Sequence, residues 1–135
     1  MAIDPAAVLA WGQPRLRDLP WRAIRDPWPI LVAEVMLQQT RLDVVLPYWH
    51  RWMGRFPSLA RLAAASEQEV LHLWQGLGYY ARGRRLHRAA RLLQQEEGAD
   101  IWPRTLQGWQ ALPGIGRSTA GSILSSAFDL PAAIL

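Results

Sequence analysis

The amino-acid sequence predicts an all-α protein, and three observations support that fold class. Apolar residues recur at helical spacing along most of the chain, and capping residues with glycine or proline stops divide it into short segments. No stretch alternates apolar and polar residues as a half-buried strand would. A chain of 135 residues that is 50% hydrophobic is long enough to bury one core. We therefore expect a single helical domain.

The N-terminal part, residues 1–28, is predicted to be a short helix followed by an arm. Asp4 is a candidate cap for that helix and Gly12 a candidate stop. Residues 13–29 contain four prolines together with arginines and tryptophans, a composition that favours an ordered loop over a regular element. The helical body is therefore expected to span residues 29–135.

The first half of that body is predicted to contain four helices. An apolar helix is expected to open at Pro29 and to end near Thr40. A second helix follows, and Pro47 inside its apolar pattern implies a late start or a kink. Ser58 is a candidate cap for the third helix. Ser66, followed three residues later by a glutamate, forms a capping-box pattern for the fourth.

The second half begins with the most clearly amphipathic segment, residues 80–97. One face of it is apolar, and the opposite face carries a row of arginines at positions 84, 85, 88 and 91. We interpret this row as a solvated face, because it lies opposite the apolar stripe. Thr105 can cap a short helix, which a Leu-Pro-Gly-Ile-Gly stretch joins to a last helix at residues 117–128.

The charge composition indicates an anionic partner. The net charge is +4, and all fifteen basic residues are arginines. The arginine fork matches phosphate oxygens, which favours nucleic acid, although codon usage in a GC-rich genome would explain the same composition. Because there is no lysine, a Schiff-base mechanism through a side-chain amine is excluded.

Other classes of function are disfavoured by what the sequence lacks. There is no cysteine and the three histidines lie far apart, so we expect no disulfide, thiolate-held cluster or metal site in this chain. No apolar run approaches the roughly 20 residues of a membrane span, and the N-terminus does not read as a leader. We therefore expect a cytoplasmic protein without membrane contact.

The Leu-Pro-Gly-Ile-Gly stretch is a candidate phosphate-binding turn. Gly114 and Gly116 can both adopt positive φ, and without side chains they let a phosphate approach the amides at the start of the following helix. An ordinary turn between two helices is the alternative.

Glu34 is the candidate catalytic residue. It stands in an otherwise aliphatic helical segment, so its carboxyl should be short of water, with a raised pKa that lets it hold a proton near neutral pH. A buried glutamate paired with an arginine is the structural alternative.

Five blocks of sequence together resemble one enzyme family. They are DLPWR at 18–22, EVMLQQT at 34–40, RFP at 55–57, EVLHLWQGLGYYAR at 69–82 and ALPGIGRSTAG at 111–121. Their order and spacing are similar to those of the adenine DNA glycosylases of the MutY type, in the helix-hairpin-helix glycosylase superfamily. The resemblance implies an endonuclease III-like helical barrel with the helix-hairpin-helix motif at about 105–128. It also implies a nucleoid-associated monomer that acts in base excision repair of double-stranded DNA in which adenine is mispaired with 8-oxoguanine or guanine.

The resemblance also implies roles for single residues. Glu34 would deliver a proton to N7 of an extruded adenine, so that the base leaves and the N-glycosidic bond is hydrolysed. Gln39 and Tyr79 would fill the DNA stack beside the lesion. Core packing is the alternative for Tyr79 and for Trp21. The residues implied in the adenine pocket and its approach are Leu19, Trp21 and Arg22.

At the hairpin, Gly114 and Gly116 would grip a DNA phosphate without reading sequence, and Thr119 would let the second helix pack closely. A monovalent cation often binds the carbonyls of this turn in the family. Gln38 and Thr40, in the second block, are further candidate DNA contacts. Ser118 stands where endonuclease III-type enzymes carry a lysine nucleophile, which implies a monofunctional, hydrolytic glycosylase.

Some features of the family have no match in residues 1–135. They are a second catalytic residue, an aspartate in an Asp-Gly-Asn-Val stretch, the cysteines of a 4Fe-4S cluster and the domain that recognises 8-oxoguanine. Asp129 does not match the aspartate's position. We therefore expect no cofactor in this chain, and little or no activity from it alone. The alternatives are a non-enzymatic helix-hairpin-helix DNA-binding module, which would tolerate glutamine in place of Glu34, and a helical protein-interaction domain with a solvated arginine face.

Overall fold

The computed structural model describes residue 20 and residues 25–96 and 101–129. All regular elements within these residues are helices, which confirms the predicted fold class. The predicted helix at 4–12 and three predicted pocket residues, Leu19, Trp21 and Arg22, lie outside the described residues. The part of the chain that the structure describes contains seven helices: α2 (Pro27–Leu37), α3 (Leu42–Arg55), α4 (Leu59–Ala64), α5 (Glu67–Trp74), α6 (Ala81–Gln94), α7 (Leu106–Gln110) and α8 (Arg117–Phe128).

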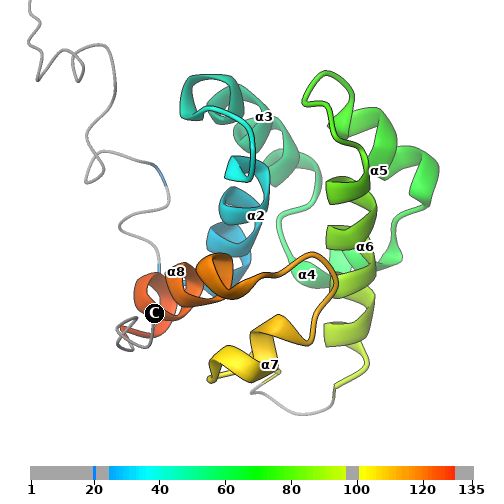
Figure 1. Cartoon of the computed structure of the whole chain (residues 1–135). Coiled ribbons are helices and arrows are strands. Elements are labelled where there is room, and N and C mark those ends of the chain that lie inside the picture. The colour runs from blue at the N-terminus through cyan, green and yellow to red at the C-terminus, as the bar shows by residue number, and fades with distance from the viewer. Residues whose placement is uncertain (1–19, 21–24, 97–100, 130–135) are drawn as a thin grey trace, which may run out of the picture.

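Helix α2 is the central element, and it packs against α3, α6 and α8 (Figure 1). Almost every side chain along it is buried, as its aliphatic sequence requires. It begins at Pro27, because the Asp26 side chain accepts a hydrogen bond from the amide of Trp28 and the proline occupies the first helical position. The start predicted at Pro29 was therefore two residues late. The helix ends at Leu37.

The predicted caps at Ser58, Ser66 and Thr105 are confirmed. Each side chain accepts a hydrogen bond from an amide three residues later, at 3.3, 3.1 and 3.0 Å. The reciprocal half of the predicted capping box is not seen, because the carboxylate of Glu69 pairs with Arg55 of α3.

Helix α3 begins five residues before Pro47, so the late start that this proline suggested is wrong. Proline has no N–H to give to the carbonyl four residues earlier, and the helix continues past the missing bond. None of the helices in the described part of the chain is long and apolar enough to cross a membrane.

Buried tryptophans hold the helices together. Trp28 of α2 donates from Nε1 to the Phe56 carbonyl at 2.9 Å, which ties the start of α2 to the end of α3. Trp52 of α3 meets Trp74 of α5 edge to face, with ring centroids 5.6 Å apart. All three tryptophans are at most 2% exposed, so a ligand cannot reach them.

Helix α6 confirms the amphipathic pattern predicted for it. The four arginines of the predicted solvated face are exposed. Arg91 of that face donates to the carbonyls of Ala63 and Ala65, at 3.3 and 3.1 Å, and so fastens the end of α4. In contrast, Arg82 on the opposite face is buried.

Candidate active site and nucleic-acid interface

Glu34 lies on the side of α2 that packs against α8. Its carboxylate accepts a hydrogen bond from the Ser122 hydroxyl, and the side chain is half-buried. Burial raises the pKa of Glu34 above its ordinary value, and the hydrogen bond from Ser122 opposes that rise in part. The salt bridges found among the described residues do not include Glu34, so the alternative of a structural glutamate–arginine pair has no support there.

One helical turn further along, Gln38 connects α2 to the hairpin. Its side-chain Nε2 donates to the Gly114 carbonyl at 3.1 Å and to Thr119 Oγ1 at 3.0 Å. Because positions four residues apart share a helix face, Glu34 and Gln38 lie along one seam between α2 and α8. We call this contact, formed by Glu34 with Ser122 and by Gln38 with Gly114 and Thr119, the α2–α8 seam.

The hairpin turn agrees with the sequence prediction at one glycine and differs at the other. Gly114 has φ +81°, as expected for a turn that favours glycine. Gly116 has φ −89° and ψ −177°, an extended conformation open to any residue, so the prediction of positive φ there was wrong. A side chain at Gly116 would meet no atom within 4 Å, so the glycine leaves open space in front of α8.

The first turn of α8 combines an exposed surface with a packed interior. Gly116 stands at the N-cap of α8 and has no side chain that could cap the helix. Ser118 is exposed, whereas Thr119 and Ala120 are buried against the rest of the domain. The buried pair is small, as close packing of the second hairpin helix requires.

Gln39 follows the end of α2 and Tyr79 precedes the start of α6, and these two helices contact each other. Both are exposed, and the core-packing alternative for Tyr79 is wrong because 64% of its surface is accessible. Both also have left-handed backbones, with φ +62° and +50°. Thr40, beside Gln39, is half-buried.

The buried Arg82 connects these two turns and was missed by the sequence reasoning. Its guanidinium donates to Thr40 Oγ1 at 2.8 Å and to the Gly78 carbonyl at 3.2 Å. A signal was present, because Arg82 falls on the same helical stripe as Leu86 and Leu93, which is otherwise apolar. An arginine on the apolar face of a helix needs hydrogen-bond acceptors in the interior.

Two of the hollows on the surface of the described residues differ in their relation to Glu34. One, of about 280 Å³, is lined by Arg25, Ser125, Ser126 and Asp129. Its serines lie one turn beyond Ser122 on α8, so it adjoins the α2–α8 seam, although Glu34 does not line it.

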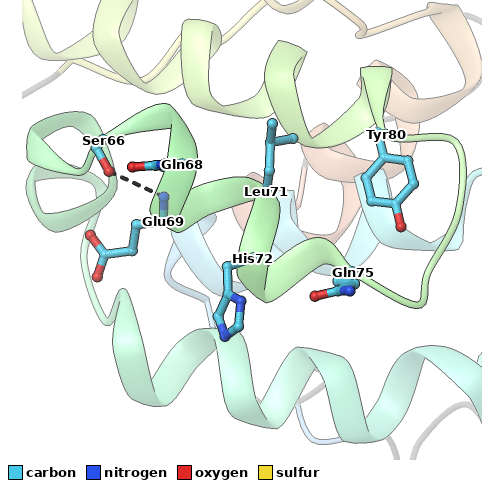
Figure 2. Close-up of a pocket in the computed structure, with 7 residues that line it drawn as sticks. All are labelled: Ser66, Gln68, Glu69, Leu71, His72, Gln75 and Tyr80. Carbon is cyan, nitrogen blue, oxygen red and sulfur yellow. Dashed lines mark hydrogen bonds between the residues drawn. The ribbon is translucent and has the colours of Figure 1, made fainter.

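The other hollow, of about 790 Å³, runs along the flank of α5 from Ser66 to Tyr80 (Figure 2). None of the predicted site residues lines it. Among the described residues, no three histidine, cysteine, aspartate or glutamate side chains gather closely enough to hold a metal ion.

The sequence is similar to those of known proteins. Residues 32–129 match the model of the HhH-GPD superfamily base excision DNA repair proteins. The chain is 48% identical over 131 residues to the adenine DNA glycosylase of Mus musculus, covering 90% of this chain and 25% of that protein. It is 42% identical over 130 residues to the adenine DNA glycosylase of Mycolicibacterium smegmatis, covering 96% and 44%. The chain thus spans less than half the length of these curated relatives.

Solved structures show the same fold. A thermostable thymine-DNA glycosylase superimposes with a TM-score of 0.75 at 25% identity, over 92% of this chain and 57% of that one. A non-covalent endonuclease III–DNA complex gives 0.74 at 21% identity, over 93% and 57%. The helix-hairpin-helix of α7 and α8, the Glu34 helix packed against it and the match over residues 32–129 agree: the chain belongs to the HhH-GPD superfamily of base excision DNA repair proteins.

Proposed function

We propose that the chain supplies the proton-donating and DNA-gripping part of an adenine DNA glycosylase. The reaction is hydrolysis of the N-glycosidic bond of adenine mispaired with 8-oxoguanine or guanine in double-stranded DNA. The relatives are named adenine DNA glycosylases, which supports adenine as the substrate base. The observation that carries the proposal is the α2–α8 seam, in which a half-buried carboxyl of raised pKa lies one helical turn from a side chain bound to the hairpin turn.

The proposed chemistry needs Glu34 to be neutral before reaction. Its proton passes to the extruded adenine as the bond between the base and C1′ of the sugar breaks, so the base leaves uncharged. Positive charge develops on the sugar, and water adds its hydroxide to C1′ and releases a proton. The Ser122 hydroxyl can donate to the carboxylate that remains.

The hairpin and the two exposed turns supply DNA contacts in this proposal. The open space at Gly116, in front of the first turn of α8, lets a phosphate approach the backbone of the hairpin. Gln39 and Tyr79 are exposed and free to enter the gap that base extrusion leaves. Because the sequence contains no lysine, strand cleavage through a lysine Schiff base is not part of the proposal.

A monovalent cation at the hairpin is also a proposal. The Gly114 carbonyl already accepts a hydrogen bond from Gln38. A carbonyl oxygen has two lone pairs, so it can keep that bond and still contact a cation. The cation would help to hold the turn against the DNA backbone.

The decisive experiment is a single-turnover assay of adenine release from duplex DNA with adenine opposite 8-oxoguanine. Wild type is compared with Glu34→Gln, and DNA binding is measured for both at two salt concentrations. We expect binding by both proteins, weaker at high salt, and base release that depends on Glu34. If residues 1–135 release adenine too slowly to measure, they replace the matching segment of the Mycolicibacterium smegmatis relative, and the comparison is repeated there.

The outcomes separate the alternatives. Base release that survives Glu34→Gln would remove the assigned role of Glu34. Binding with no release in either protein context would indicate a DNA-binding module without catalysis. The absence of any salt-dependent DNA affinity would favour a protein-interaction domain.

A further inference from the structure

Arg82, in the first turn of α6, is only 4% exposed and connects two separate turns. Its Nη1 donates to carbonyls at the end of α2, including that of Met36 at 2.7 Å and that of Gln38. Its Nη2 donates to Thr40 Oγ1 and to the Gly78 carbonyl. One guanidinium thus binds the turn after α2 and the turn before α6.

The chemistry of these contacts explains why an arginine occupies the position. The last carbonyls of a helix have no partner within the helix, and a cation at that end is favoured by the helix dipole. Trp74 also supports the arrangement. Its ring lies 5.2 Å from the Arg82 guanidinium carbon, and its Nε1 donates to the Gly78 carbonyl at 3.0 Å.

The two turns that Arg82 holds contain strained residues. Gln39 and Tyr79 have φ of +62° and +50°, a region that costs a residue with a side chain roughly 1–2 kcal/mol. Such a conformation persists only where its surroundings enforce it. Arg82 binds both neighbours of Gln39, namely the Gln38 carbonyl and the Thr40 hydroxyl. On the other side it binds Gly78, which precedes Tyr79, and its guanidinium carbon lies 5.6 Å from the Tyr79 ring.

We propose that Arg82 is a positioning residue that fixes Gln39 and Tyr79 relative to each other, so that both side chains enter the DNA stack as one preformed unit. The inference rests on the proposed function for what the unit does, but the clamp itself is a property of the protein without DNA. Lysine could not replace the arginine fully, because a single nitrogen cannot serve two turns as a planar fork does.

The first test measures hydrogen exchange in the chain without DNA. Wild type is compared with Arg82→Met, with the conservative variant Arg82→Lys, and with Arg91→Met. Arg91 is the matched control, because it is also an α6 arginine that donates to carbonyls but serves the end of α4. In Arg82→Met we expect amides 38–40 and 77–80 to exchange about tenfold faster or more, which corresponds to about 1.4 kcal/mol of local opening. Core amides of α8 should be unchanged.

The second test measures base unstacking, with all proteins carrying Glu34→Gln so that no base is released. A 2-aminopurine replaces the target adenine, and its fluorescence rises when the base leaves the stack. We expect Arg82→Met to lower this rise by about fivefold or more while overall DNA affinity changes by about twofold or less, because phosphate contacts dominate affinity. Arg82→Lys should restore part of the rise, and Arg91→Met should match the protein that carries Glu34→Gln alone.

The results test three things separately, namely the clamp, its effect on the DNA stack and the proposed function. Unchanged exchange in Arg82→Met, or faster exchange with normal unstacking, would overturn the positioning role. If the Glu34→Gln protein with Arg82 intact never unstacks the probe, the proposed function fails together with the DNA part of this inference. Hydrogen exchange still decides whether Arg82 holds the two turns. If Arg82→Met does not fold, Arg82→Lys and Thr40→Val, which removes one acceptor of the clamp, carry the same two tests.

Discussion

The carboxylates of α2 and α5 occupy opposite environments. Glu67 and Glu69 stand in the first turn of α5 and pair with Arg84 and Arg55. Glu34 stands late in α2, half-buried, with a serine hydroxyl as its partner. Glu67 and Glu69 stabilise the start of α5 through the helix dipole, and their ion pairs connect α5 to α6 and α3.

This difference shows which carboxyl can carry a proton into a reaction. Burial without a cation favours the neutral form of a carboxyl, which raises the pKa of Glu34. Of these three residues, only Glu34 lies on the α2–α8 seam with the hairpin. The following changes test that contrast.

The largest effect is expected for Glu34→Gln. The amide keeps the size of the side chain but has no proton to transfer, so adenine release should fall by about 10²–10⁴-fold, the usual range for loss of a general acid. Single-turnover base release is the measurement, with Glu67→Gln as the matched control at near wild-type rate. Equal losses in both variants would mean that Glu34 has no special role.

The second effect is a dependence on pH. The raised pKa of Glu34 keeps the active, protonated form present to a higher pH than an ordinary glutamate. The rate should then fall by up to about tenfold per unit once the pH exceeds that pKa. A rate that rises over this range would contradict the assigned acid.

The same group should affect stability with a defined sign. Between the ordinary value of 4.5 and the raised pKa, the folded state binds more protons than the unfolded chain, so the free energy of unfolding falls as pH rises. Urea unfolding at a series of pH values measures this slope. Glu34→Gln should flatten it, and an unchanged slope would show that the carboxyl is not desolvated.

Substitution of the two hairpin glycines should have smaller effects, one on stability and the other on DNA binding. Gly114→Ala places a side chain at φ +81° and 3.0 Å from Arg85, so it should lower the free energy of unfolding by about 1–2 kcal/mol. Gly116→Ala meets open space in an ordinary conformation, so stability should stay within about 0.5 kcal/mol of wild type. Its added methyl should instead weaken DNA binding by crowding the phosphate. Normal DNA affinity in Gly116→Ala would place the phosphate elsewhere.

The smallest effect is expected at α5. Glu69→Gln removes the charge that pairs with Arg55 near the surface, which should cost about 1 kcal/mol or less of unfolding free energy. Base release should not change. A large loss of activity would show that the α5 flank, with its hollow, takes part in function.

Several parts of the fold were predictable because their causes are local. Ser58, Ser66 and Thr105 cap helices by binding amides only three residues away, so the short sequence window holds both partners. The amphipathic α6 likewise follows from periodicity within one segment. The exposed position of Tyr79 was different, since composition alone favoured the core, and the resemblance to a family supplied the prediction.

The sequence by itself determined the helical class, the caps, the carboxyl among aliphatic neighbours and the glycine turn, because each depends on residues close together in the chain. Only the tertiary structure decided that Gln38 meets Gly114 and Thr119, which lie 76 and 81 residues away, and that Arg82 joins two turns. Such contacts depend on how distant helices cross. The packing of the whole domain determines which groups such a side chain contacts, and no local sequence pattern contains that information.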